Sequence, residues 1–146
     1  MNRFSYKVFE QPLEAIDFGK KTVINTINQY SFCVAENDSQ FKEALLHSDI
    51  LLPDGVGITW AYRFLFGKHI QKIAGADLHS YCLKELNKTG GRCFYLGAST
   101  STLQLIQQKI KLEFPNVIVA TYSPPFKSVF SKQDNTAMIA AVNAFE

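Results

Sequence analysis

Short apolar runs alternate with longer segments of helical pattern from Lys21 onward, and this alternation constrains the fold more than any other feature. The apolar runs at 23–27, 50–52, 93–96 and 117–122 have the length of buried strands. Strands that alternate with helices are typical of βα units, which pair their strands in parallel and cover the sheet with helices. The pattern therefore predicts an α/β fold, a Rossmann-like parallel sheet with flanking helices.

Local signals indicate where the connecting helices begin and end. Asp38, Asp77 and Ser131 are candidate N-caps, Asp77 for a helix over 77–87 and Ser131 for a helix over 132–145. Gly90 and Gly91 should end the first of these two helices. The segment 56–66 is apolar nearly all round, which predicts a helix buried on more than one side. Residues 4–8 alternate between apolar and polar types, as an edge strand does.

A chain of 146 residues with 47% apolar composition can bury the core of one domain, so we expect residues 1–146 to form a single domain. In the βα rhythm the last helix would lead to another parallel strand, and none follows. We therefore expect the sheet to be incomplete and the chain to be truncated at its C-terminus. Apolar residues of that helix would then be partly uncovered, which favours self-association as a homo-oligomer; they are Met138, Ile139, Val142 and Phe145.

Charge and composition exclude several classes of protein. The 15 basic and 13 acidic residues are scattered, which argues against nucleic acid as a partner. No apolar run approaches the ~18 residues of a membrane span. Three cysteines without C-x-x-C spacing, and histidines without ligand spacing, predict no zinc or other metal site. We expect a soluble, cytoplasmic protein without a cofactor.

Asp54 is the strongest candidate for a catalytic residue. It follows the apolar run 50–52 after a single proline and precedes Gly55, so its carboxylate should lie at a strand end beside a helix N-terminus. Ligands of open parallel sheets bind beyond the carboxyl ends of the strands, and a carboxylate held there can act as a base. The alternative is that Pro53, Asp54 and Gly55 form an ordinary turn in which Asp54 caps the next helix.

The other predicted strand ends also carry polar residues or glycine. Thr26 and Asn28 offer a hydroxyl and an amide to a ligand, or cap the next helix. The turn at 97–100, with Gly97, Ala98 and Ser99, would let a phosphate approach the backbone at a helix N-terminus. Asp77 could accept hydrogen bonds from a sugar hydroxyl, or act only as an N-cap. Tyr122 begins the last strand-end loop, 122–126.

Known nucleotide-binding and hydrolase motifs are missing from the sequence. The segment 55–60 begins like a dinucleotide fingerprint, but Trp60 replaces the third glycine, where close helix packing needs no side chain. No G-K-[ST] follows a glycine-rich loop, and no G-x-S-x-G occurs. A Rossmann dehydrogenase, a P-loop protein and an acyl-transfer enzyme are therefore not supported.

Four segments resemble, in order and spacing, the WecG/TagA/CpsF family of bacterial glycosyltransferases, which is glycosyltransferase family 26. They are 24–28 (INTIN), 49–57 (DILLPDGVG), 73–78 (IAGADL) and 94–98 (FYLGA). The resemblance runs from about Thr22 to the end of the chain. The segment 122–126 (YSPPF) differs from the Gly-Tyr-Phe type segment that many members of the family have at this place.

This resemblance implies an inverting, metal-independent transfer of a sugar, often N-acetylmannosamine, from a UDP donor to a lipid-diphosphate-linked acceptor. The products would be cell-surface polymers such as teichoic acid linkage units or exopolysaccharide. By position, Asp54 matches the proposed general base and Thr26 a threonine near the donor sugar. Asn28 and Gly97 fall where the family binds the donor.

The resemblance also implies a C-terminal appendage beyond Glu146 that completes the active site and contacts the membrane. The full-length protein would then be peripheral to the inner face of the membrane, and the 146-residue chain would have little activity. A second hypothesis remains open, in which the chain is a non-catalytic nucleotide-binding or assembly module.

Overall fold

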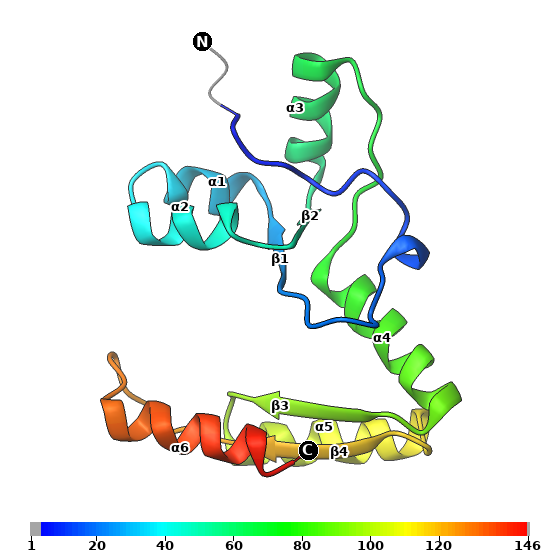
Figure 1. Cartoon of the computed structure of the whole chain (residues 1–146), viewed down its shortest axis with the longest axis vertical. Helices are drawn as coiled ribbons and strands as arrows, with labels where there is room; N and C mark the ends of the chain where they lie inside the picture. Colours follow the sequence, from blue (N-terminus) through cyan, green and yellow to red (C-terminus); the bar gives the residue numbers. More distant parts are fainter. Residues whose placement is uncertain (1–3, 146) are drawn as a thin grey trace. The chain divides into compact units, whose positions relative to one another are not determined.

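The computed structural model describes residues 4–145 and shows helices alternating with parallel strands (Figure 1). The elements in order are η1 (Leu13–Ala15), β1 (Ile24–Ile27), α1 (Gln29–Ala35), α2 (Ser39–Leu46), β2 (Ile50–Pro53), α3 (Val56–Phe66), α4 (Gly75–Thr89), β3 (Arg92–Leu96), α5 (Thr100–Glu113), β4 (Ile118–Tyr122) and α6 (Lys132–Asn143). The chain divides into two compact units, Met1–Tyr81 and Cys82–Glu146.

The first unit is built around the parallel pair β1 and β2. Their register places Ile24 opposite Ile50 and Ile27 opposite Pro53. The second edge of β2 accepts single hydrogen bonds from irregular segments, Phe9 N to Leu51 O at 2.8 Å and Ile73 N to Pro53 O at 2.8 Å. β2 is therefore held on both edges, which agrees with its fully buried Leu52.

The N-terminal segment packs into the core of the first unit, but it is not the edge strand that the sequence predicts. Phe4, Tyr6 and Val8 are buried and the residues between them are exposed, so the predicted alternation is confirmed. No strand is assigned within residues 4–10. Aromatic packing replaces the backbone ladder, since the ring of Phe4 stacks on Phe32 at 5.7 Å between centroids.

Helix α3 is buried on one side only, which corrects the prediction of burial on several sides. Ile58 and Tyr62 face the core, with 3% and 6% of their surface exposed. Val56, Trp60 and Phe64 are exposed instead. The prediction rested on apolar residues all round the helix. These residues form two apolar faces, and the first unit covers only one of them.

The second unit is built around the parallel pair β3 and β4, with Arg92 opposite Ile118 and Leu96 opposite Tyr122. α5 covers this pair through Ile110, which joins Leu83 and Val117 in the core. α6 contacts β3. Ile139 and Val142 of α6 are exposed, as the sequence analysis predicted. Self-association through these residues stays a prediction.

The structure confirms most of the predicted helix ends and caps, and it corrects two of them. Asp38 accepts a hydrogen bond from Phe41 N, and Ser131 forms a reciprocal capping box with Asp134. α4 begins at Gly75, so Asp77 lies in its first turn and is not the N-cap. α6 ends at Asn143 and not at Phe145, because the chain leaves the helix through a C-cap at Ala144.

The fold class is confirmed as mixed α/β with parallel strands and flanking helices, consistent with a Rossmann-like fold. The four strands predicted after Lys21 are present, with bounds within a residue or two of those expected, and they form two two-stranded sheets. The interpretation of residues 1–146 as a single domain remains a prediction. No helix of the described residues combines the length and apolar character that crossing a membrane requires.

Candidate functional site

Thr26 and Asp54 lie at the carboxyl ends of neighbouring strands in the first unit. Thr26 is opposite Leu52 in the register, and Asp54 N donates to Ile27 O at 2.9 Å directly after the paired residues. The predicted adjacency of the two strand ends is therefore confirmed. Parallel pairing brings a hydroxyl and a carboxylate to the same edge of the sheet, which is where open α/β sheets bind ligands.

The Asp54 side chain is partly exposed and makes no hydrogen bond or ion pair with any residue that the structure describes. The N-cap of α3 is Gly55, and no side chain caps this helix. The turn-and-cap interpretation of Asp54 is thus not observed. A carboxylate without a protein partner at a strand end can accept a proton from an external group.

Gly55 gives the Asp54 turn a backbone conformation that glycine alone adopts easily. Its φ is 99° and its ψ is 147°. A side-chain carbon added at Gly55 would lie 2.9 Å from Oε1 of Gln29. Gln29, which the sequence analysis did not single out, therefore lies beside the Asp54 turn. Its position directly after Asn28 in the polar strand-end segment was the only available signal.

We expect Gly55→Ala to lower the free energy of unfolding by about 1–3 kcal/mol, because a residue with a Cβ is strained in this region of φ and ψ. Urea denaturation of the two proteins measures the difference. Gly75→Ala is the matched control, since its added carbon would lie 3.7 Å from Cγ2 of Thr26, an ordinary contact. This control should leave stability unchanged or raise it by up to about 1 kcal/mol. Equal losses for both variants would contradict a special role for the Gly55 conformation.

Asn28 and Asp77 both have structural roles in the first unit. The Asn28 side chain accepts a hydrogen bond from Ser31 N at 2.8 Å and forms a capping box that starts α1. Asp77 Oδ2 accepts a hydrogen bond from Ala74 N at 2.8 Å at the start of α4. The capping alternative is therefore observed for Asn28, whereas Asp77 binds the backbone from within the first turn of α4 and is not its N-cap. Their predicted contacts with a ligand remain predictions, since each side chain keeps a second polar atom.

The second unit contains a groove of about 800 Å³ at the carboxyl ends of β3 and β4. Two of the predicted strand-end loops meet there, because Gly97 N donates to Tyr122 O at 3.0 Å and Ser123 Oγ donates to Ala98 O at 2.8 Å. The lining residues that the structure describes are Gly97, Ala98, Ser99, Thr100, Ser123, Pro124, Pro125, Phe126, Lys127 and Phe130. Tyr122 supports the groove through its carbonyl and is not among them.

The floor of the groove leaves the backbone open to a ligand. Gly97 has a φ of 125°, and no heavy atom lies within 4 Å of where its side-chain carbon would be. Ala98 has a φ of 62°, the only positive φ of a non-glycine residue in the described part of the chain. Ser99 caps α5 and its Oγ lies 2.9 Å from the hydroxyls of both Ser101 and Thr102. Hydroxyls, backbone amides and a helix N-terminus together suit an anion.

Lys127 is the one cation among the described lining residues of the groove, and the sequence analysis did not single it out. Its Nζ lies 2.9 Å from both carboxylate oxygens of Asp134. The Lys127 ammonium, together with hydrogen bonds from Ser131, lowers the pKa of Asp134 to about 2. No motif marks a single lysine that follows two prolines and a phenylalanine, so only the structure could reveal it.

We expect the Asp134 carboxyl to titrate near pH 2 in the folded protein and Lys127→Met to raise its pKa toward 3.8. Because the folded pKa lies below the unfolded one, the stabilisation is present above about pH 4 and is lost as the pH falls toward 2. A carboxyl-carbon NMR titration measures both values. A folded-state pKa that is near 3.8 and insensitive to Lys127→Met would show that the ion pair does not persist in solution.

Comparison with known proteins identifies the family of this chain. Residues 2–146 match the family described as "Glycosyl transferase WecG/TagA/CpsF family". The chain is 33% identical over 101 residues to the N-acetylglucosaminyldiphosphoundecaprenol N-acetyl-beta-D-mannosaminyltransferase of Bacillus subtilis (strain 168), covering 69% of this chain and 40% of the relative. It is 30% identical over 109 residues to a protein of the same description from Bacillus spizizenii (strain ATCC 23059 / NRRL B-14472 / W23), covering 74% of this chain and 42% of the relative.

The family match covers nearly the whole chain and includes both polar strand ends of the first unit and the groove of the second. The chain spans about two fifths of the length of these curated relatives. The resemblance seen in the Pro-Asp-Gly and Gly-Ala-Asp-Leu segments is confirmed. This chain belongs to the WecG/TagA/CpsF family of glycosyl transferases.

Proposed function

We propose that this protein transfers N-acetylmannosamine from a UDP donor to an acceptor in which N-acetylglucosamine is linked through a diphosphate to a lipid. The acceptor and the sugar are those named for the Bacillus relatives. The observation that carries the proposal for this chain is the Asp54 carboxylate, which stands unpaired among the described residues at the end of β2. The product would enter the synthesis of a cell-envelope polymer such as teichoic acid or an exopolysaccharide.

Asp54 would act as the general base. It would take the proton from the acceptor hydroxyl as that oxygen attacks the anomeric carbon of the donor sugar, and UDP would leave from the opposite side. One in-line displacement inverts the anomeric configuration and needs a single base. Thr26, on the neighbouring strand end, would hold the donor sugar, as the family resemblance implies. Gly55 would keep the space beside the carboxylate free of side chain.

The groove of the second unit would, with its own residues, bind the diphosphate of a nucleotide such as UDP. The backbone amide of Ala98, the Ser99 hydroxyl and the N-terminus of α5 would face the negative charge of the diphosphate. Lys127 would break its ion pair with Asp134 and form one with the diphosphate instead. The groove thus offers a cation and several hydrogen-bond donors to a diphosphate.

Titration with UDP tests the donor site. In amide spectra we expect the largest shifts at Gly97, Ala98 and Ser99. The hydrogen bond from Gly97 N to Tyr122 O should keep the loop in place. Shifts at Asn28 would support its predicted contact with the donor. Shifts confined to residues outside the groove, or no saturable shift, would refute the donor site while leaving the role of Asp54 to the assays below.

The rival hypothesis of a non-catalytic nucleotide-binding or assembly module predicts the same UDP binding. The two hypotheses differ in activity. The rival predicts that the protein made from the full native reading frame transfers sugar to no acceptor. The predicted cytoplasmic location, peripheral to the inner face of the membrane, is part of the present proposal and is tested by cell fractionation.

A further inference from the structure

Helix α3 presents a second apolar face that the first unit does not cover. Val56, Trp60 and Phe64 are 58%, 64% and 84% exposed. They follow one another at intervals of four residues, so they form a single stripe along the helix. Ile58 and Tyr62 lie on the opposite side, in the core. We call Val56, Trp60 and Phe64 the outer stripe.

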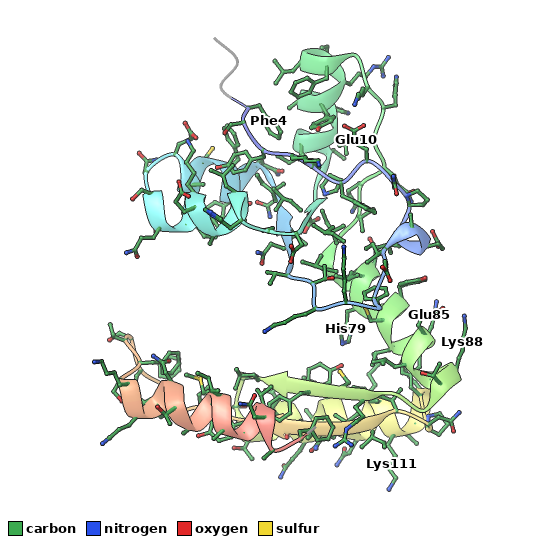
Figure 2. The ribbon with its side chains drawn as sticks, viewed as in Figure 1. Phe4, Glu10, His79, Glu85, Lys88 and Lys111 are labelled. Carbon is green, nitrogen blue, oxygen red and sulfur yellow. The ribbon has the colours of Figure 1, made fainter. Side chains whose placement is uncertain are left out.

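The N-terminal segment accounts for the packing of the inner face only. The ring of Phe4 lies 5.8 Å from that of Tyr62, and the Tyr62 hydroxyl donates to Glu10 Oε1 at 3.4 Å. Figure 2 shows Phe4 and Glu10 along the same segment beside α3. Packing in the first unit therefore explains why Tyr62 is apolar and aromatic, but it gives no reason for three large apolar side chains on the outer stripe.

α3 and the loop that follows it carry a net positive charge, and the acidic residue Asp54 precedes the helix. Residues 55–76 contain Arg63, Lys68, Lys72 and no aspartate or glutamate. Lys68 is paired with Glu10 at 2.7 Å. Arg63 and Lys72 are exposed and form no ion pair with the residues that the structure describes. Arg63 therefore lies on the same helix as the exposed apolar stripe, and Lys72 lies in the loop that follows that helix.

We propose that the outer stripe of α3 lies on the surface of an anionic phospholipid bilayer, with Arg63 and Lys72 at the lipid phosphates. An 11-residue helix is too short to span a bilayer, so it would lie in the plane of the interface. Tryptophan favours that interface, and each nearby cation strengthens binding to anionic lipid. This contact lies within the chain, separate from the membrane contact that the family resemblance assigns to the region beyond Glu146.

Charge favours a bilayer over a second copy of the chain as the occupant. A symmetric contact through the outer stripe would bring Arg63 of both copies, which lies on α3 next to Phe64, to the same interface, where like charges oppose association. Anionic lipid headgroups complement these cations instead. The inference goes beyond the proposed function and does not depend on it, since lipid binding needs neither a donor nor an acceptor.

The sequence contains one tryptophan, Trp60, so its fluorescence reports on the outer stripe directly. The 146-residue chain is titrated with vesicles of equal parts phosphatidylglycerol and phosphatidylcholine, with vesicles of phosphatidylcholine alone, and with both kinds carrying brominated acyl chains. We expect a blue shift of Trp60 emission and quenching by bromine with the anionic vesicles. Binding should weaken as salt is added, because the electrostatic part is screened.

Two variants and one control locate the contact. Phe64→Ser should weaken vesicle binding about tenfold, since a large apolar side chain no longer enters the interface. Arg63→Gln combined with Lys72→Gln should weaken binding to anionic vesicles about tenfold or more. Leu112→Ser on α5 is the matched control, because Leu112 is also 84% exposed; it should bind vesicles like the unchanged chain. All four positions are exposed, so circular dichroism should show unchanged folding.

Several results would overturn the inference. One is Trp60 emission that no vesicle changes, and another is vesicle binding without bromine quenching of Trp60, which would place the contact on another surface. Equal weakening by Phe64→Ser and Leu112→Ser would show that exposed apolar groups act without regard to place. A blue shift that depends on protein concentration and not on lipid would assign the outer stripe to a second copy.

Discussion

Replacing Asp54 with asparagine should lower kcat by about 10²–10⁴-fold, the usual effect of losing a general base. Asparagine keeps the size and shape of the side chain, but it cannot take the proton from the acceptor hydroxyl. The dissociation constant of UDP should stay nearly unchanged, because the base acts on the acceptor. Steady-state UDP release and UDP titration, both on the product of the full native reading frame, measure the two quantities.

Asp17→Asn is the matched control for this experiment. It removes the same charge from the first unit in an exposed loop, where the Asp17 carboxylate accepts a hydrogen bond from Gly19 N at 2.8 Å. We expect its kcat to equal that of the unchanged enzyme. Near-normal kcat in Asp54→Asn would show that the strand-end carboxylate is not the base, and a loss of UDP binding would indicate that Asp54 supports the structure of the site.

Replacing Lys127 with methionine should raise the dissociation constant of UDP about tenfold. A hydrogen bond from an ammonium to a phosphate typically contributes about 1.5–3 kcal/mol, and part of this is offset here because Lys127 must first leave Asp134. The carboxylate of Asp134 would also remain without its cation in the variant, close to the bound diphosphate. Isothermal titration with UDP measures the change.

Lys132→Met gives the matched control for the groove. Lys132 begins α6, carries the same charge and is exposed, but it is not among the described residues that line the groove. We expect its dissociation constant for UDP to stay within about twofold of the unchanged value, since an exposed charge outside the site contributes little. Equal weakening by both variants would mean that net charge, and not the position of Lys127, determines UDP binding.

Two features could be predicted from the sequence: the strands, and the position of polar residues together at the strand ends. The first depends on local pattern and the second on parallel pairing. The runs that became β1 and β2 are short and apolar, and parallel pairing then requires Thr26 and Asp54 to lie at the same edge. The capping box of Ser131 and Asp134 was predictable for a similar reason, since its two hydrogen bonds join residues three apart in the sequence.

Features that depend on tertiary packing could not be predicted. An apolar residue such as Trp60 is compatible with a core or with a docking surface, and only the fold shows that the first unit leaves it exposed. Lys127 belongs to the candidate site because the loop after β4 meets the turn after β3. Gln29 lies beside Gly55 because two helices begin next to each other. None of these contacts has a signature in the local sequence.

The central claim is a sugar transfer that uses Asp54. Its most direct measurement is UDP release, with product analysis, from UDP-N-acetylmannosamine and a synthetic acceptor in which N-acetylglucosamine is joined through a diphosphate to a lipid chain. On the product of the full native reading frame we predict UDP release that requires the acceptor, a disaccharide product of inverted anomeric configuration, and loss of both in Asp54→Asn. A protein that binds UDP but forms no disaccharide, or an Asp54→Asn variant that forms it at the normal rate, would contradict the account.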